Sequence, residues 1–139
     1  MIRELCTDTD ILSQVCEPAT AEDAELAADL VEMLEADDDA ACLAANQVGV
    51  THAVFAYKDE ADNIHVVYNA KIKRALGAFK AEESCLTLED ISKVTRYQKI
   101  QMLFEELVDG ELVSRKKELM GWEAQVCQHM IDHCKGKLV

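Results

Sequence analysis

The sequence feature that most constrains this chain is the segment Gln128–His133, which reads Gln-His-Met-Ile-Asp-His. His129 and His133 are four residues apart, so on an α-helix their side chains lie on one face, about 40° apart in projection. Two imidazoles at this spacing can bind one metal ion, as in the His-Glu-x-x-His motif of zinc proteases, in which the glutamate is the general base. Met130 occupies the position of that glutamate. The segment therefore predicts a metal-binding helix that lacks the usual carboxylate.

The composition limits the classes of protein to which this chain could belong. The chain has 139 residues, half of them hydrophobic, which is typical of one globular domain over residues 1–139. A net charge of −13 argues against nucleic acid and against an anionic membrane as partners. No run approaches the roughly 20 apolar residues of a membrane span, and Met1–Leu5 do not resemble a signal peptide. We therefore expect a cytoplasmic location, and no pattern indicates an oligomeric state.

The six cysteines are expected to be thiols, because a reducing cytosol disfavours disulfides. Most of them are expected to be small buried hydrophobic side chains. No Cys-x-x-Cys pair occurs, which excludes a zinc ribbon and a thioredoxin-type motif.

Hydrophobic periodicity predicts a helix, a series of strands and a second helix, which is an α+β fold. The first helix spans 21–36, with Thr20 as its N-cap, and the second begins near Gly121 and ends at Gly136. An Asp109-Gly110 turn predicts a hairpin. Residues 1–19 are expected to be an irregular lead-in and residues 80–90 a polar loop. The strand patterns cover 51–57, 64–69, 71–78, 92–96, 99–107 and 111–115.

A metal site on the second helix needs a further ligand, because catalytic sites usually take three protein ligands and keep one position open. Cys85 is the best candidate, since a thiolate suits iron or zinc. The alternative is that His129 and His133 are buried core residues with hydrogen-bond partners. Unpaired imidazoles in an apolar helix would be costly, and a shared metal ion would remove that cost.

Three segments resemble, in order, the three motifs of the peptide deformylase family. Ala40–Gln47 resembles its GxGLAAxQ motif, Glu83–Thr87 its EGCLS motif and Gln128–His133 its QHExDH motif. The resemblance covers nearly the whole chain. It implies antiparallel sheets packed around a buried C-terminal motif helix, with an N-terminal helix. It also implies a hydrolase that removes the N-formyl group from the formyl-methionine of nascent peptides, as a step of protein maturation after translation.

The resemblance also assigns roles to residues of this chain. It implies one divalent metal ion, Fe²⁺ or a substitute such as Zn²⁺ or Ni²⁺, held by Cys85, His129 and His133. Gln47 matches the amide that stabilises the developing oxyanion, and the backbone N–H of Leu86 would be the second donor. The substrate channel of the family is bordered by the first motif, and the matching residues of this chain are Cys42 and Leu43.

Several residues depart from the family pattern. Met130 cannot transfer a proton, and loss of a general acid–base group typically costs on the order of 10²–10⁴ in rate. Asp132 projects to the other side of the histidine pair, so we do not expect it to substitute; Glu82, Glu83 and Glu89 remain alternatives. We also expect Glu83 to have a structural role, pairing with Arg96. Family glycines are replaced by three larger residues that are expected to hinder substrate access: Ala40, Cys42 and Ser84.

Three hypotheses follow from this pattern. The first is a divergent deformylase, or a hydrolase of a related N-acyl substrate. The second is an inactive pseudoenzyme of the same fold that binds a metal ion or a formyl-methionyl peptide. The third is a structural remnant whose histidines are core residues. We predict an intact metal site with weak or absent deformylase activity.

Overall fold

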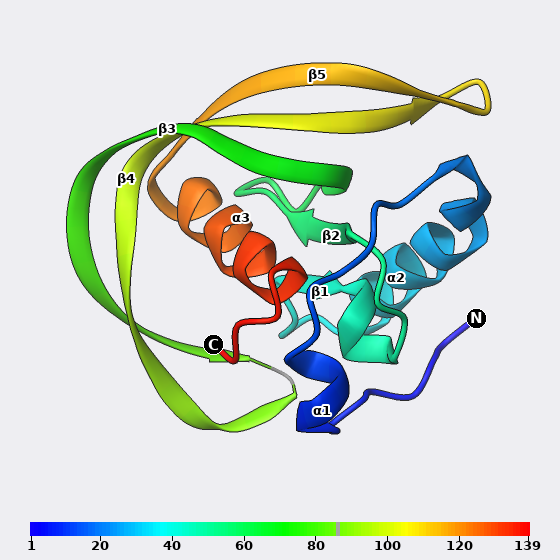
Figure 1. The fold of residues 1–139 in the computed structure, drawn as a ribbon, viewed down its shortest axis with the longest axis horizontal. Helices are drawn as coiled ribbons and strands as arrows, with labels where there is room; N and C mark the ends of the chain where they lie inside the picture. Colours follow the sequence, from blue (N-terminus) through cyan, green and yellow to red (C-terminus); the bar gives the residue numbers. More distant parts are fainter. Residues whose placement is uncertain (86) are drawn as a thin grey trace.

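The computed structural model describes residues 1–85 and 87–139. Within these residues, five strands form one antiparallel sheet in the order β1-β2-β3-β4-β5, and the helices pack against it (Figure 1). The helical elements are α1 (Thr9–Leu12), a 3-10 turn (Ala21–Asp23), α2 (Ala24–Ala36), a second 3-10 turn (Ala45–Val48) and α3 (Gly121–Cys134). The strands are β1 (Cys42–Ala44), β2 (Val54–Lys58), β3 (Ile64–Cys85), β4 (Leu88–Val108) and β5 (Glu111–Met120).

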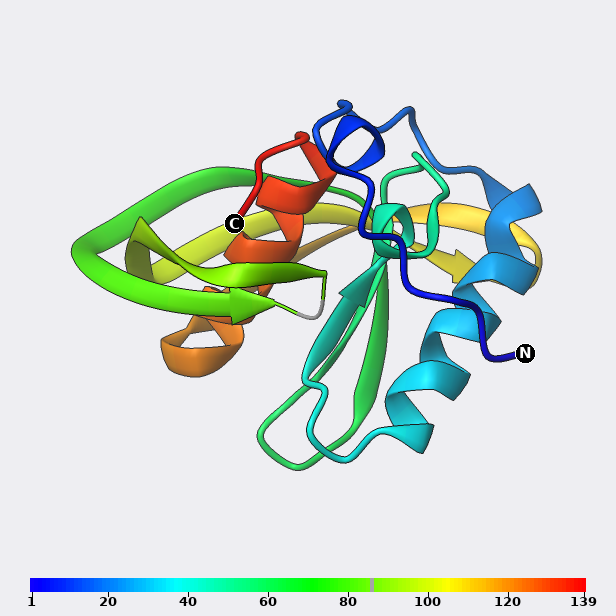
Figure 2. The ribbon, with the colours of Figure 1, turned by 90° about the horizontal axis from the view of Figure 1, so that it is seen from below.

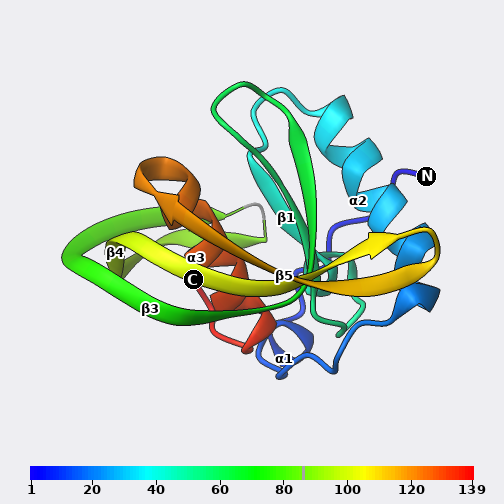
Figure 3. The ribbon, with the colours of Figure 1, turned by 90° about the horizontal axis from the view of Figure 1, so that it is seen from above.

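The long strands β3 and β4 curve together around α3 (Figures 1 and 3). Their pairing runs from Tyr68 opposite Glu105 to Cys85 opposite Leu88, with three irregularities of register along the way. Such bulges bend a strand and increase its twist. The curvature brings Cys85, at the end of β3, to the helix that carries the two histidines.

Strand β2 separates two hydrophobic clusters, because successive side chains of a strand point to opposite faces. Phe55 and Tyr57 join the cluster beneath α3, whereas Val54 and Ala56 join the cluster beneath α2. Both clusters are almost entirely shielded from solvent. The two helices accordingly lie on opposite sides of β1 and β2 (Figure 2). This arrangement confirms the α+β fold and the buried motif helix.

The N-terminal helix follows the predicted pattern. Its first turn is the 3-10 turn Ala21–Asp23, which leads directly into α2. Thr20 accepts a hydrogen bond from the backbone N–H of Glu22, and Asp23 accepts one from the backbone N–H of Thr20 at 2.9 Å. These two bonds form a capping box, which satisfies backbone donors that a helix start leaves unpaired.

Two expectations about loops were wrong. The lead-in 1–19 contains the short helix α1, which begins after Asp8, whose side chain accepts a hydrogen bond from the backbone N–H of Asp10. The stretch 80–90 is largely strand rather than loop: residues 80–85 form the end of β3 and residues 88–90 the start of β4. Polar side chains are compatible with strands there because the hairpin exposes much of its surface, and the backbone ladder does not depend on side-chain polarity. Lys80 even bonds across the pair, to Thr95 at 2.8 Å.

Strands β4 and β5 are longer than the sequence predicted, whereas β2 is shorter than the predicted strand at 51–57. The patterns at 92–96 and 99–107 belong to one strand, β4, and the return strand β5 continues to Met120. The predicted hairpin turn is confirmed, with Asp109 and Gly110 both at positive φ, 51° and 82°. In the part of the chain that is described, the helices are too short or too polar to cross a membrane.

Candidate metal centre

The ligand-type side chains predicted from the motifs lie together in the fold. His129 and His133 come from α3 and Cys85 from the end of β3, and one ligand atom of each lies within 4.8 Å of the others. The Nε2 atoms of the two imidazoles are 3.1 Å apart. Nitrogen ligands about 2.0–2.1 Å from a tetrahedral metal ion lie about 3.3 Å from each other. The donor set and its spacing therefore fit a single metal ion.

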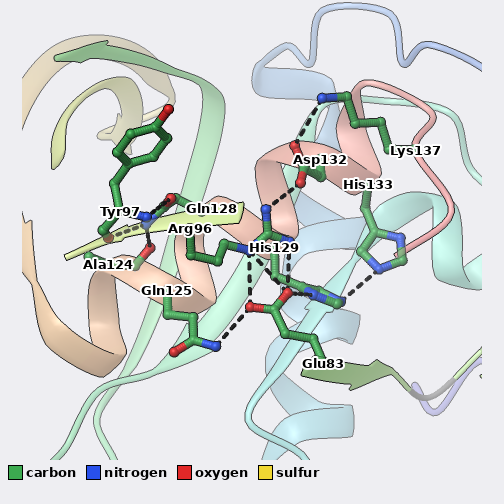
Figure 4. Close-up of polar contacts among 10 residues, drawn as sticks. All are labelled: Glu83, Arg96, Tyr97, Ala124, Gln125, Gln128, His129, Asp132, His133 and Lys137. Carbon is green, nitrogen blue, oxygen red and sulfur yellow. Dashed lines mark hydrogen bonds and ion pairs between the residues drawn. The ribbon is translucent and has the colours of Figure 1, made fainter. Parts of the chain in front are cut away.

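Glu83 fixes the orientation of His129 (Figure 4). Its Oε1 lies 2.7 Å from Nδ1 of His129, so the other ring nitrogen faces Cys85 and His133. Arg96 donates to both oxygens of Glu83, with a shortest distance of 2.7 Å. This confirms the predicted pairing of Glu83 with Arg96, but the sequence did not reveal that the carboxylate also holds a candidate ligand.

Two more side chains complete this buried network. Gln125 donates to Oε2 of Glu83 at 2.8 Å. The Nη1 atom of Arg96 donates to Oδ2 of Asp132 at 2.6 Å (Figure 4). Glu83 and Arg96 are 9% and 3% exposed, so both charges depend on these partners. The network joins the second motif, β4 and α3 into one rigid support.

The hydrogen bonds of the centre favour the ionised forms of Glu83 and Cys85. Burial raises the pKa of Glu83, but hydrogen bonds from His129, Arg96 and Gln125 outweigh burial and lower the pKa to about 2. Burial likewise opposes ionisation of Cys85, yet hydrogen bonds from His129, His133 and Thr87 lower its pKa to about 5. Burial lowers the pKa of His129, but Cys85 and Glu83 raise it overall. A thiolate at Cys85 is the form that binds metal ions.

His133 is held through its backbone as well as through the contacts of its ring with His129 and Cys85. Asn46, which is completely buried, donates through Nδ2 to the backbone oxygen of His133 at 2.9 Å. Within the described residues, Oδ1 of Asn46 and Nδ1 of His133 have no hydrogen-bond partner. Sequence reasoning missed Asn46, although an amide in a run of small apolar residues was a signal that could have pointed to it.

Gln47 lies beside the second motif. The backbone N–H of Ala44 donates to its Oε1 at 2.9 Å, so its Nε2 faces the other way and donates to Thr87 at 3.3 Å. The hydroxyl of Thr87 is in turn 3.5 Å from the sulfur of Cys85. Thr87, which sequence reasoning did not select, therefore connects Gln47 to the candidate ligand. Leu86 lies outside the described residues, and its role stays a prediction.

Met130 lies in the wall of a cavity of about 280 Å³ that adjoins this centre. Its side chain is 1% exposed. The replacements of family glycines also contribute to this wall, as the resemblance implied. The lining residues are Asp39, Ala40, Ala41, Cys42, Gln47, Ser84, Cys85 and Met130.

The two residues predicted to contact substrate are placed differently. Cys42 lines the cavity, and burial together with the negative charges of Cys85 and Glu83 raises the pKa of its thiol to about 12. Leu43 points to the opposite side of β1, into the cluster beneath α2, and is 1% exposed. Any contact of Leu43 with substrate would therefore be through its backbone, and both assignments stay predictions.

The carboxylates considered as replacements for the missing glutamate are held elsewhere. Glu83 is bound to His129 and Arg96, and Asp132 is bound to Arg96. Glu82 is exposed, and the side chain of Glu89 lies outside the described part. Among the described cavity residues the one carboxylate is Asp39, an exposed residue that ends a run of three aspartates.

The fold and the centre together define a class: an α+β protein with a candidate single-metal site built from a His-x-x-x-His helix and a cysteine. A family model for polypeptide deformylase matches residues 2–139. A peptide deformylase of Clostridium beijerinckii is 30% identical over 141 residues, which cover 100% of both chains. The chain belongs to the polypeptide deformylase family.

Solved structures agree with this assignment. The crystal structure of the peptide deformylase from Thermus thermophilus superposes with a TM-score of 0.85 and 27% identity, covering 99% of this chain and 83% of that one. The peptide deformylase from Thermotoga maritima gives a TM-score of 0.84 and 27% identity, covering 99% and 95%. The match supports a hydrolase of this family.

Proposed function

We propose that this chain is a peptide deformylase-like metallohydrolase whose removal of N-formyl groups from formyl-methionyl peptides is weak or absent. One observation carries the proposal: Met130 lies in the cavity wall beside Cys85 and Gln47, where the family motif has its general acid–base glutamate. A thioether is at best a weak hydrogen-bond acceptor and carries no exchangeable proton. Loss of such a group typically lowers the rate on the order of 10²–10⁴-fold. The proposed substrate belongs to protein maturation in the cytoplasm.

The retained residues would still perform part of the chemistry. Cys85, His129 and His133 are the residues that would hold a divalent ion, Fe²⁺, Zn²⁺ or Ni²⁺, which as a Lewis acid activates water. Glu83 would keep the ring of His129 in its binding orientation. The amide of Gln47, fixed by Ala44, would donate a hydrogen bond to the formyl oxygen as negative charge develops there.

Proton transfer to the leaving amine is the step without a suitable residue. Glu83 and Asp132 are each bound to Arg96, and a carboxylate that moved away would leave this buried guanidinium with one charged partner in place of two. Asp39 is exposed and lies at the cavity, so it is the one described carboxylate there that could act weakly. This shortage supports impaired turnover rather than full activity.

The alternative function is a pseudoenzyme that binds a metal ion, or a formyl-methionyl peptide, without turnover. The small size of the cavity favours the form of this alternative that binds a metal ion alone. At about 280 Å³ the cavity is at the lower limit of small-molecule sites, which are typically about 300–1,000 Å³. Ala40, Cys42 and Ser84 all line it in place of family glycines. Binding a peptide there would require the wall to move.

The decisive experiment restores the missing carboxylate. Protein is prepared anaerobically, its metal content is measured, and deformylation of formyl-Met-Ala-Ser is assayed for the wild type, Met130→Glu and Met130→Gln. We expect Met130→Glu to raise turnover at least 100-fold and the isosteric Met130→Gln to leave it near the wild-type level.

Each other outcome decides against part of the proposal. Wild-type turnover equal to that of Met130→Glu, and lost in Cys85→Ala, would identify an efficient enzyme with another proton donor. A Met130→Glu protein that holds metal but stays inactive would favour the pseudoenzyme. Failure of the wild type to bind iron, nickel or zinc would leave the structural remnant.

A further inference from the structure

The segment after α1 is packed against the end of the motif helix α3. The backbone N–H of Cys16 donates to the backbone oxygen of Cys134 at 2.9 Å. A Cβ atom added to Gly136 would lie 2.5 Å from the backbone oxygen of Ser13. Figures 1 and 3 show α1 beside the C-terminal end of α3. Two parts of the chain that are far apart in sequence are therefore held in direct contact.

Cysteine side chains face each other across this contact. A hydrogen bond between the thiols of Cys16 and Cys134 lowers the pKa of Cys16; burial raises this pKa, the nearby His52 lowers it, and the pKa is lowered overall. Both cysteines are half-buried, so small oxidants can reach them. A backbone hydrogen bond between two residues brings their Cα atoms close to the ~4.4–6.8 Å separation that disulfides require.

We propose that Cys16 and Cys134 are an oxidation site, at which a hydroperoxide converts two thiols into a reversible disulfide. The thiolate of Cys16 attacks the peroxide and breaks its O–O bond, which gives a sulfenic acid and one molecule of water or alcohol. The sulfur of Cys134 then attacks the sulfenic sulfur, the S–S bond forms, and a second molecule of water leaves. Two thiols are oxidised by two electrons and the peroxide is reduced by two.

The other cysteines are less suited to this reaction. Burial raises the pKa of both Cys42 and Cys127. Cys85 faces the two histidines as a candidate metal ligand. Cys6 is half-buried, and its backbone bonds to Gln47 rather than to another cysteine. The site therefore belongs to one pair.

The disulfide would act on the metal-binding helix, because Cys134 directly follows His133. It would join the segment after α1 covalently to the last turn of α3. A disulfide between Cys16 and Cys134 would close most of the chain into one loop. Because this loop restricts the unfolded chain, we expect the melting temperature to rise on the order of 5–15 °C. The inference does not depend on deformylase activity.

The test uses the full chain loaded with zinc, so that Cys85 is engaged, and treats it with stoichiometric hydrogen peroxide. We expect the wild type to lose two of its six free thiols and two hydrogens of mass, and dithiothreitol to restore both. Fragment spectra of the linked peptide should join Cys16 to Cys134. The loss should vanish in Cys16→Ser and persist in the matched control Cys6→Ser.

The wild-type peptide map decides the question even if a variant folds poorly. A disulfide between other cysteines, retention of all six thiols, or over-oxidation of Cys16 without a link would each overturn the proposal. An unchanged melting temperature of the linked protein would leave the site but contradict its effect on the helix.

Discussion

Oε1 of Glu83 lies 2.7 Å from Nδ1 of His129, so the second sequence motif orients a candidate ligand of the third. The same carboxylate neutralises Arg96, which itself reaches Asp132 on α3. A ligand ring held by a carboxylate presents its other nitrogen to the metal in a fixed direction. The centre is therefore preformed, although its parts come from segments far apart in the sequence.

Replacing this carboxylate should weaken metal binding. In Glu83→Gln the amide cannot neutralise Arg96, and His129 loses its charged partner. We expect zinc affinity to fall about 10–100-fold. The measurement is competition with a chromophoric chelator. The neighbouring Glu82→Gln is the control, because Glu82 is exposed and should leave affinity unchanged; equal affinities of all three proteins would contradict the assigned role.

Glu83 should also make the metal-free protein sensitive to acid. Its pKa is about 2 in the fold against an ordinary value of 4.5, a difference worth on the order of 3 kcal/mol. A depressed carboxyl pKa contributes stability above pH 4.5, and that contribution is lost as the pH falls through about 2. Urea unfolding at pH 6, 4 and 3 should therefore show the wild type approaching Glu83→Gln in stability as the pH falls. A constant difference between them would refute this.

The sequence predicted the elements well where the signal was local. The helical period of 21–36, the Asp109-Gly110 turn and the spacing of His129 and His133 each depend on neighbouring residues, and the structure agrees with each. Local patterns failed at residues 80–90, where polar side chains indicated a loop. There the strand is formed by pairing between β3 and β4, an interaction that a single segment does not reveal.

The supporting residues of the site were harder to predict for the same reason. Thr87 ends the segment that resembles the second motif and Gln125 lies outside the motifs, but the roles of both depend on where Gln47 and Glu83 lie in the fold. Asp39 follows two other aspartates and carries no motif signal, and only the fold places it at the cavity. Motif spacing identifies side chains that lie together on one helix or strand. Contacts between different helices and strands can be identified only from the tertiary structure.

Asn46 provides a test of such a contact. Asn46→Ala removes one of the two donors to the backbone oxygen of His133, the other being the backbone N–H of Gly136, and a lost hydrogen bond typically costs about 0.5–1.5 kcal/mol. We expect that loss in the free energy of unfolding, together with weaker zinc binding, because the end of the motif helix becomes less fixed. Asn63→Ala, in an exposed turn, should stay within about 0.5 kcal/mol of the wild type. Similar values for the two variants would disprove the role of Asn46.

Gly136 tests the contact between the segment after α1 and the end of α3. Gly136 has a φ of 78°, and a Cβ there would meet the backbone of Ser13 and Gln14 at 2.5–2.8 Å. Gly110 has a similar φ of 82° but nothing within 4 Å of its Cβ position, so it isolates the cost of the left-handed backbone. We expect Gly110→Ala to cost about 1–2 kcal/mol, and Gly136→Ala to cost about 1–3 kcal/mol more.

Urea denaturation of both glycine variants measures this difference. Because the clash is with backbone atoms, the segment cannot relieve it by a side-chain rotation and must move away from α3. Peroxide should then link Cys16 to Cys134 more slowly in Gly136→Ala than in Gly110→Ala, since the two thiols would meet less often. Equal destabilisation and equal rates of linkage in the two variants would show that the close packing at Gly136 does not hold the segment in place.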